Sequence, residues 1–151
     1  AMFRGNSDTT LINGIIATPN NECIRMNGSG GANAATLTAR SVVMQCNTAK
    51  FIGTGSYTAA QVATFFGSGS NNNNDAFTAS LSAVFVNGAA ETAVTAFDAK
   101  TLDSFFDTTT YIGAVKDSSD TWYAGWTCNS AYAPFDSTSN ANRACTSLPI
   151  T

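Results

Sequence analysis

Short apolar segments separated by turn residues fill the first fifty positions of the chain. Asn13-Gly14 and Asn27-Gly28 each follow such a segment, and Asn-Gly favours turns because both residues tolerate positive φ. Apolar runs bounded in this way are typical of β-strands. The predicted strands cover residues 10–12, 15–17, 22–26 and 36–46.

A helical pattern follows at residues 57–67, where apolar side chains recur at the i, i+3, i+4 spacing of one helix face. Thr58 is the expected N-cap, and Gln61 completes a capping box three residues later. Gly67 suits the position just beyond the C-terminus of a helix. These signals predict a short helix that packs one apolar face onto the core.

The same pattern returns forty residues later. Residues 97–107 align with residues 57–67 without a gap, and Asp98 stands where Thr58 stands in the first copy. Leu102, Phe105 and Phe106 occupy the matching apolar positions. We therefore expect a second short helix with a similar buried face.

The remaining segments complete one expected domain. A polar run at 68–75 predicts an exposed loop, and strands are expected at 79–86 and 111–115. A chain of 151 residues is long enough for one core and too short for two. The predicted single domain spans residues 1–151 and divides into strands over 1–50, a helix–strand–helix segment over 51–110, and a strand with a disulfide-stapled tail over 111–151.

Composition and charge exclude several functions. Only 11% of the residues are charged, against about 25% in an ordinary soluble domain, and the net charge is -3. The seven basic residues are scattered, which argues against nucleic-acid binding. The chain contains no His, so Ser-His-Asp and Cys-His catalysis and His-based metal sites are ruled out.

The four cysteines point to disulfides. Cys23, Cys46, Cys128 and Cys145 include no Cys-x-x-Cys pair of the kind that binds zinc or iron–sulfur clusters. An even count in a chain poor in charge fits an oxidising compartment, and no apolar run approaches the ~18 residues of a membrane span. Three pairings are possible, and the local pairs Cys23–Cys46 and Cys128–Cys145 are favoured. Each would stabilise the fold by roughly 3 kcal/mol in the chain-entropy model.

The strand pattern alone leaves two architectures open. Cys23 and Cys46 are 23 residues apart, which is about one coil of a parallel β-helix. The short strands would equally suit an antiparallel sandwich.

A resemblance favours the first architecture. The segment Tyr111-Ile112-Gly113-Ala114-Val115 and the following Trp122-Tyr123-Ala124-Gly125-Trp126-Thr127-Cys128 resemble the C-terminal block of a group of secreted, mostly uncharacterised bacterial proteins, many of them predicted lipoproteins. Residues 4–14 and 145–151 are similar to a late coil and to the natural C-terminus of that group. The resemblance implies a mainly β fold, the C-terminal coils of a right-handed parallel β-helix, with a cap of two short helices and disulfide-pinned loops. It implies an extracellular or cell-surface location in a bacterium and no activity.

The aromatic block is the candidate binding site. Trp122, Tyr123 and Trp126 lie beside Asp117 and Asp120, and rings with carboxylates are what a sugar site uses. The alternative is that the three rings clamp the tail over the end of the core. The polar turn that holds the two aspartates could bind calcium, although it lacks the ligand count and the glycine of an EF-hand; no other cofactor is expected.

We expect a non-catalytic extracellular structural module that caps a secreted bacterial β-helix protein and mediates self-assembly or surface attachment. An open first coil would lack a neighbour and would pair with the remainder of a longer chain or with other copies. The side chains expected on that face are Phe3, Leu11, Ile12, Ile15 and Ile16.

Two other functions remain. A carbohydrate-binding module would hold a cell-surface polysaccharide on Trp122, Tyr123 and Trp126. A pilin-like extracellular subunit would explain the C-terminal disulfide loop, although the chain lacks the long apolar N-terminal helix of such subunits.

Overall fold

The computed structural model describes residues 1–124, 127–130 and 143–145. Their contacts group the chain into two compact units. The first consists of Ala1–Ala79 with Val94–Ile112, and the second of Ser80–Ala93 with Gly113–Thr151. The expectation of one domain over residues 1–151 stays a prediction.

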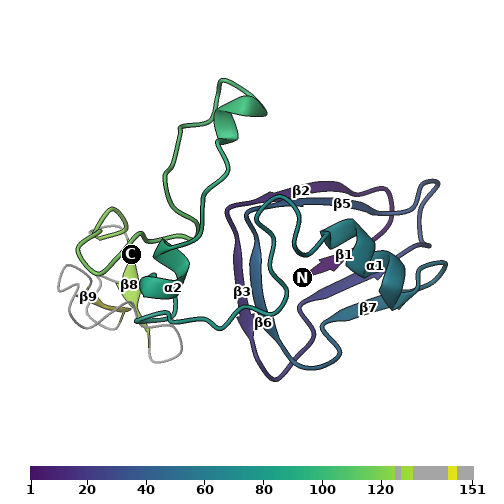
Figure 1. The fold of residues 1–151 in the computed structure, drawn as a ribbon, viewed down its shortest axis with the longest axis horizontal. Helices are drawn as coiled ribbons and strands as arrows, with labels where there is room; N and C mark the ends of the chain where they lie inside the picture. Colours follow the sequence, from purple (N-terminus) through teal and green to yellow (C-terminus); the bar gives the residue numbers. More distant parts are fainter. Residues whose placement is uncertain (125–126, 131–142, 146–151) are drawn as a thin grey trace. The chain divides into compact units, whose positions relative to one another are not determined.

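Seven strands of the first unit form three small parallel sheets (Figure 1). The first sheet contains β1 (Met2–Phe3), β4 (Ile24–Asn27) and β7 (Phe51–Thr54). The second contains β2 (Asp8–Ile12) and β5 (Thr36–Arg40), and the third contains β3 (Ile15–Thr18) and β6 (Val43–Cys46). Each of β4, β5 and β6 pairs with the strand three positions earlier in the strand order, so that Asp8 lies opposite Thr36 and Ile15 opposite Val43.

The prediction of a right-handed parallel β-helix is wrong. Across the described residues the strands form separate sheets of two or three strands, with no closed or solenoid sheet. A solenoid builds its core by stacking about three or more repeats. Here only one strand position recurs a third time, at β7, and the chain then enters a helix. The strand pairs named by residue are all parallel, so the antiparallel sandwich is not formed either.

The helix α1 (Ala59–Phe66) confirms the first helical prediction. The Thr58 hydroxyl accepts a hydrogen bond from the Gln61 backbone N–H at 3.3 Å, and the Gln61 side chain accepts one from the Thr58 N–H at 2.8 Å. Gly67 ends the helix in the left-handed conformation with φ 66°. Val62 and Phe66 turn inward and are fully buried.

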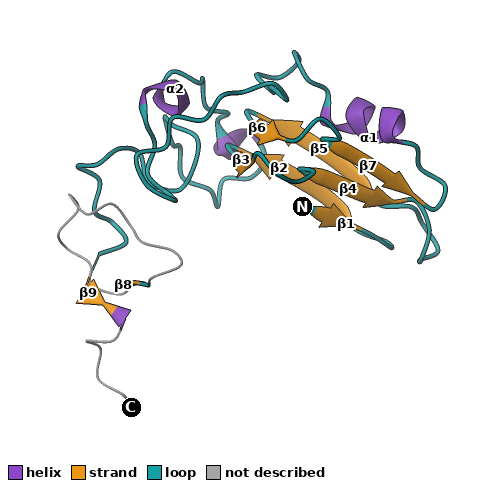
Figure 2. Ribbon diagram, turned by 90° about the horizontal axis from the view of Figure 1, so that it is seen from below, coloured by secondary structure: helices purple, strands orange, loops and turns teal. Residues whose placement is uncertain are grey.

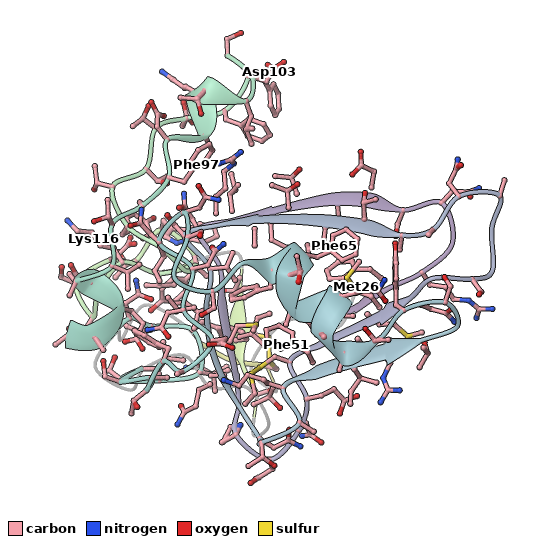
Figure 3. The ribbon with its side chains drawn as sticks, turned by 45° about the vertical axis from the view of Figure 1, so that its right-hand side comes forward. Met26, Phe51, Phe65, Phe97, Asp103 and Lys116 are labelled. Atoms are coloured by element: carbon pink, nitrogen blue, oxygen red, sulfur yellow. A yellow bond between two sulfur atoms is a disulfide. The ribbon has the colours of Figure 1, made fainter. Side chains whose placement is uncertain are left out.

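The core of the first unit lies between the strands and α1. Its buried side chains come from β4, β5, β6 and α1, with Met26, Leu37 and Met44 among the strand residues. The rings of Phe51 and Phe66 have centroids 5.6 Å apart, and Figure 3 shows Met26 and Phe51 beside the helix. Burial of a side chain such as Phe66 contributes roughly 1.5–3 kcal/mol.

The second predicted helix is wrong. Residues 97–107 form only the 3-10 turn η1 (Ala99–Thr101), and the expected apolar face is exposed. Asp98 does cap η1, since its carboxylate accepts from the Lys100 N–H at 3.1 Å. Asp103 then accepts from the Phe105 N–H at 2.8 Å, a local turn that competes with helical hydrogen bonding. The first copy has Ala63 where this copy has Asp103, and an Asp inside a helix competes for backbone hydrogen bonds and favours turns.

The second unit has little regular structure in its described part. It contains α2 (Ala89–Thr92) and the short parallel pair β8 (Cys128–Asn129) and β9 (Arg143–Ala144) (Figure 2). The strands predicted at 79–86 and 111–115 reduce to one isolated bridge between Val86 and Val115. Glu91 is fully buried, and its carboxylate accepts hydrogen bonds from Ser80 and Gly88.

Both favoured disulfides are confirmed. Cys23 is bonded to Cys46 within the first unit, and Cys128 to Cys145 within the second. Among the helices that the structure describes, none has the length and apolar character needed to cross a membrane.

Candidate functional site

The predicted aromatic block is only partly a surface. Trp122 is 52% exposed, and its indole N–H donates to the Ala114 carbonyl at 2.9 Å. Tyr123 is 1% exposed and packs with Val86 and Val115, so it belongs to the core of the second unit. Trp126 lies outside the described residues. Of the aromatic residues in this block that the structure describes, Trp122 is therefore the one whose ring a ligand could reach.

The two aspartates of the block hold a turn. The Asp117 carboxylate accepts from the Ser119 hydroxyl at 2.5 Å and from the Ser119 N–H at 2.9 Å. The Ser119 hydroxyl, followed by its N–H, lowers the pKa of Asp117. Asp120 accepts from the Lys116 N–H at 3.0 Å. Both carboxylates already accept local donors in the polar turn, and a sugar or a calcium ion would have to compete with these bonds.

A metal centre has no ready ligand cluster in the residues described. Within residues 1–124, 127–130 and 143–145, no three Cys, Asp or Glu side chains gather closely enough to hold a metal ion.

One end of the first unit's core is covered. We call it the closed end, and it consists of α1 together with residues 71–77, which lie over β5, β6 and β7. The backbone of residues 71–77 bonds along β6: Asn74 O accepts from the Met44 N–H at 2.8 Å, and the Asn74 N–H donates to Val42 O at 3.0 Å. The outer backbone groups of this part of the strand stack are therefore paired.

Asn73 fastens the closed end. It is buried, and its side-chain amide donates to the carbonyls of Ala39 at 2.7 Å and Phe66 at 2.9 Å. Its Oδ1 accepts from the Val42 N–H at 3.1 Å. One side chain therefore satisfies backbone groups of β5, α1 and the turn before β6.

Among the described residues, none forms such a cover at the opposite end of the core. We call it the open end, and it consists of the outer edges of β1, β2 and β3 and the side chains between them. Figure 2 shows α1 next to β7 and β1 at the far edge of the same sheet. Phe3, Leu11 and Ile16 pack against the core here but remain only partly buried. No strand of the described chain pairs with the outer edges of β1, β2 and β3.

The register shows which backbone groups face outward at the open end. Ser7 O accepts from the Thr36 N–H and the Asn13 N–H donates to Arg40 O, so the odd-numbered residues of β2 direct their groups toward β5. Groups alternate between the two sides of a strand. The N–H and C=O of Thr10 and Ile12 therefore point away from β5, toward the open edge.

A projecting segment is rooted beside the open end. We call residues 97–109 the arm. Asn13, in the turn between β2 and β3, donates its amide to Phe97 O at 2.9 Å and accepts from the Phe97 N–H at 2.7 Å. The Arg40 guanidinium lies 5.4 Å from the centroid of the Phe97 ring. Figure 1 shows the arm extending away from the strands, and Figure 3 shows Phe97 toward its base and Asp103 at its tip.

The arm tip exposes apolar side chains. Phe105 is 86% exposed, Leu102 47% and Phe106 40%, and the two phenyl rings meet edge to face with centroids 5.7 Å apart. The spacing of these side chains in the sequence predicted a buried helix face, so the sequence did not predict that they would be exposed. The Asp103-Ser104 pair in the second copy was the available signal that the helix would stop.

Comparison of the chain with protein-family models, with curated proteins and with solved structures found no match. The resemblance to secreted bacterial proteins therefore stays a prediction, and the geometry of the open end carries the functional argument.

Proposed function

We propose that the chain is a non-catalytic, extracellular structural module that assembles with copies of itself through the open end. The observation that carries this proposal is the contrast between the two ends of one core. At the closed end residues 71–77 pair with the edge of β6, Asn73 bonds to Ala39 O of β5, and the side chains of Val62 and Phe66 are fully buried. At the open end, no described strand pairs with the outer edges of β1, β2 and β3, and the side chains of Phe3, Leu11 and Ile16 are only partly buried.

Two physical terms favour association at this end. Exposed strand edges present rows of hydrogen-bonding groups that template the addition of another segment. Covering partly exposed apolar side chains adds about 25 cal/mol for each Å² removed from water. The closed end prevents head-to-tail growth because α1 already occupies it, so the assembly expected is a closed pair rather than a fibre.

The cysteines and carboxylates support the rest of the proposal. Two disulfides favour an oxidising, extracellular compartment. Glu91 and Asp117 accept hydrogen bonds from neighbouring serines, which is structural use of the groups that an acid–base mechanism would need.

Substitution at Thr10 tests the open edge directly. Proline there removes an N–H that faces outward while leaving the bonds between β2 and β5 in place. Thr10→Val keeps that N–H and is the matched control. Light scattering after size exclusion should show a concentration-dependent pair for the wild type and for Thr10→Val, and a monomer for Thr10→Pro. A wild-type chain that stays monomeric at millimolar concentration would contradict self-assembly and favour a strand from a longer chain.

The exposed ring of Trp122 supports a second candidate function, which is carbohydrate binding by the second unit. A sugar stacked on this ring would change its fluorescence. Titration with soluble bacterial polysaccharides should quench the emission of the wild type and not that of Trp122→Ala. Identical responses in both proteins would remove this candidate.

A further inference from the structure

A cavity lies at the closed end, where the chain leaves β6 and turns toward β7 (Figure 1). Its volume is about 450 Å³, within the range of roughly 300–1,000 Å³ that is usual for small-molecule sites. Residues of β6 and of the turn after it form one side, and residues 75–77 form the other. Neither the proposed self-assembly nor the carbohydrate candidate uses this cavity.

The cavity contains an unpaired stretch of strand edge. Met44 directs its N–H and C=O outward, where they bond to Asn74 and Phe77. Groups two residues apart in a strand face the same side, so the N–H and C=O of Cys46 also face outward. Cys46 lines the cavity, and no described residue forms a backbone hydrogen bond with these two groups. The segment that covers the closed end therefore leaves β6 before the strand ends.

The next residue along the chain adds a second unsatisfied group. The Oδ1 atom of Asn47 is buried and accepts no hydrogen bond from any residue that the structure describes. An unpaired buried acceptor is unfavourable, and a donor that reaches it relieves that cost. The Asn47 N–H donates to Asn21 O at 3.0 Å, so the backbone beside the cavity is fixed. Only the side-chain amide has to turn for Oδ1 to meet a donor.

The charges in the cavity cancel. The Lys50 ammonium donates to Asp75 O at 3.0 Å and lies 3.1 Å from the Asp75 carboxylate. That carboxylate also accepts from the Ser68 hydroxyl at 2.8 Å. A charged ligand would meet a group of its own sign beside the group of opposite sign. The cavity therefore favours a ligand that carries no net charge.

We infer that the cavity binds an uncharged peptide in the extended conformation. One peptide residue exchanges its N–H and C=O with those of Cys46, which extends the edge of β6. The neighbouring peptide residue lies opposite Asn47, where a hydroxyl or amide side chain donates to Oδ1. The Cys23–Cys46 disulfide holds this part of β6 in place, so little order is lost on binding. The site is separate from the open end, and the inference does not depend on the proposed self-assembly.

Titration of the full chain with the blocked peptide acetyl-Thr-Ala-Thr-amide, followed through the backbone amide resonances, tests the inference. The Cys46 N–H resonance should shift and saturate. Ala76→Trp should abolish this shift, because Ala76 is exposed and lines the cavity, so that the larger side chain fills it. Thr78→Trp is the matched control, because Thr78 is exposed and does not line the cavity. A peptide that shifts the Thr10 resonance at the open edge and not that of Cys46 would overturn the inference.

A second peptide tests the role of Asn47. Acetyl-Val-Ala-Val-amide has nearly the shape of the threonine peptide but lacks its hydroxyl donors. The wild type should bind the threonine peptide roughly fivefold more tightly, and Asn47→Ala should bind both peptides equally. Because Asn47 Oδ1 has no partner to lose, Asn47→Ala should unfold at an unchanged or higher urea concentration. A preference for threonine that persists in Asn47→Ala would contradict this role.

An anion titration separates peptide binding from charge recognition. Sodium acetate should leave the Cys46 N–H resonance unchanged, because Asp75 offsets Lys50. A shift as large as that caused by the blocked peptide would overturn the inference, since the cavity would then be an anion site.

Discussion

The closed end and the open end of the first unit belong to one core and are completed in different ways. At the closed end, residues from 56 onward supply a helix and a bonded segment, so that the edge of β6 at Met44 and the side chains of α1 are both satisfied. At the open end, no segment among the described residues forms backbone bonds along the outer edges of β1, β2 and β3. The difference teaches that residues after β7 terminate the stack in one direction, whereas the described residues include no such segment in the other direction.

Truncation of a phenylalanine at each end should give the largest difference in stability. Phe66→Ala at the closed end removes a fully buried ring and should cost about 3–5 kcal/mol of unfolding free energy. Phe3→Ala at the open end should cost about 1 kcal/mol, because that ring is partly in water in the single copy. Urea unfolding of dilute protein measures the loss of unfolding free energy in both variants. Equal losses would show that the open end is as well covered as the closed one.

Loss of the Asn73 side chain should be the next largest effect. Asn73→Ala leaves two carbonyls and one N–H without their partner at the closed end, and we expect a loss of about 3 kcal/mol. Asn72→Gly is the control, because Asn72 is exposed and its φ of 58° suits glycine. If chemical denaturation gives the same midpoint for both variants, Asn73 does not fasten the closed end.

Removal of the Cys23–Cys46 disulfide should cost about 3 kcal/mol. The bond joins the segment before β4 to the end of β6, so it lies in the covered part of the stack. Thermal unfolding of Cys23→Ala with Cys46→Ala should show the lower midpoint, while Cys128→Ala with Cys145→Ala should leave the first unit's transition unchanged. A shift of that transition in the second variant pair would contradict the assignment of one disulfide to each unit.

Acid should weaken the ion pair at the closed end. Burial raises the pKa of Asp75. The Ser68 hydroxyl and the Lys50 ammonium, 3.1 Å from the carboxylate, together lower this pKa by more than burial raises it, so it falls below the ordinary value of 3.8. A lowered folded-state pKa gives stability that is present above pH 3.8 and is lost as the pH falls through the folded-state value. We expect about 1 kcal/mol from this partly exposed pair. Asp75→Asn should remove the corresponding part of the pH dependence, which a stability profile from pH 2 to 6 would show.

Local signals in the sequence predicted part of this structure. The capping residues Thr58 and Gln61 lie within one turn of the helix they start, so α1 follows from nearby residues alone. The local cysteine pairs were also correct. The second helix was predicted wrongly because residues 97–107 repeat the apolar spacing of residues 57–67, whereas the Asp103 carboxylate accepts from the Phe105 N–H and forms a turn instead.

Features that depend on distant residues could not be read from the sequence. The number of strand repeats depends on where the chain leaves the stack, and nothing in β7 marks it as the last strand before α1. The open face was expected near five apolar residues, of which the structure packs Phe3, Leu11 and Ile16 against the core. The arm depends on the contact of Asn13 with Phe97 across 84 positions, which no short-range pattern encodes.

Hydrogen exchange of the outward-facing amides tests the central claim most directly. The N–H groups of Thr10 and Ile12 face the open edge, whereas the Met44 N–H is bonded to Asn74 O at the closed end. We predict that protection of Thr10 and Ile12 rises with protein concentration, while protection of Met44 is high throughout. Protection of Thr10 and Ile12 that is the same at every concentration would contradict the account.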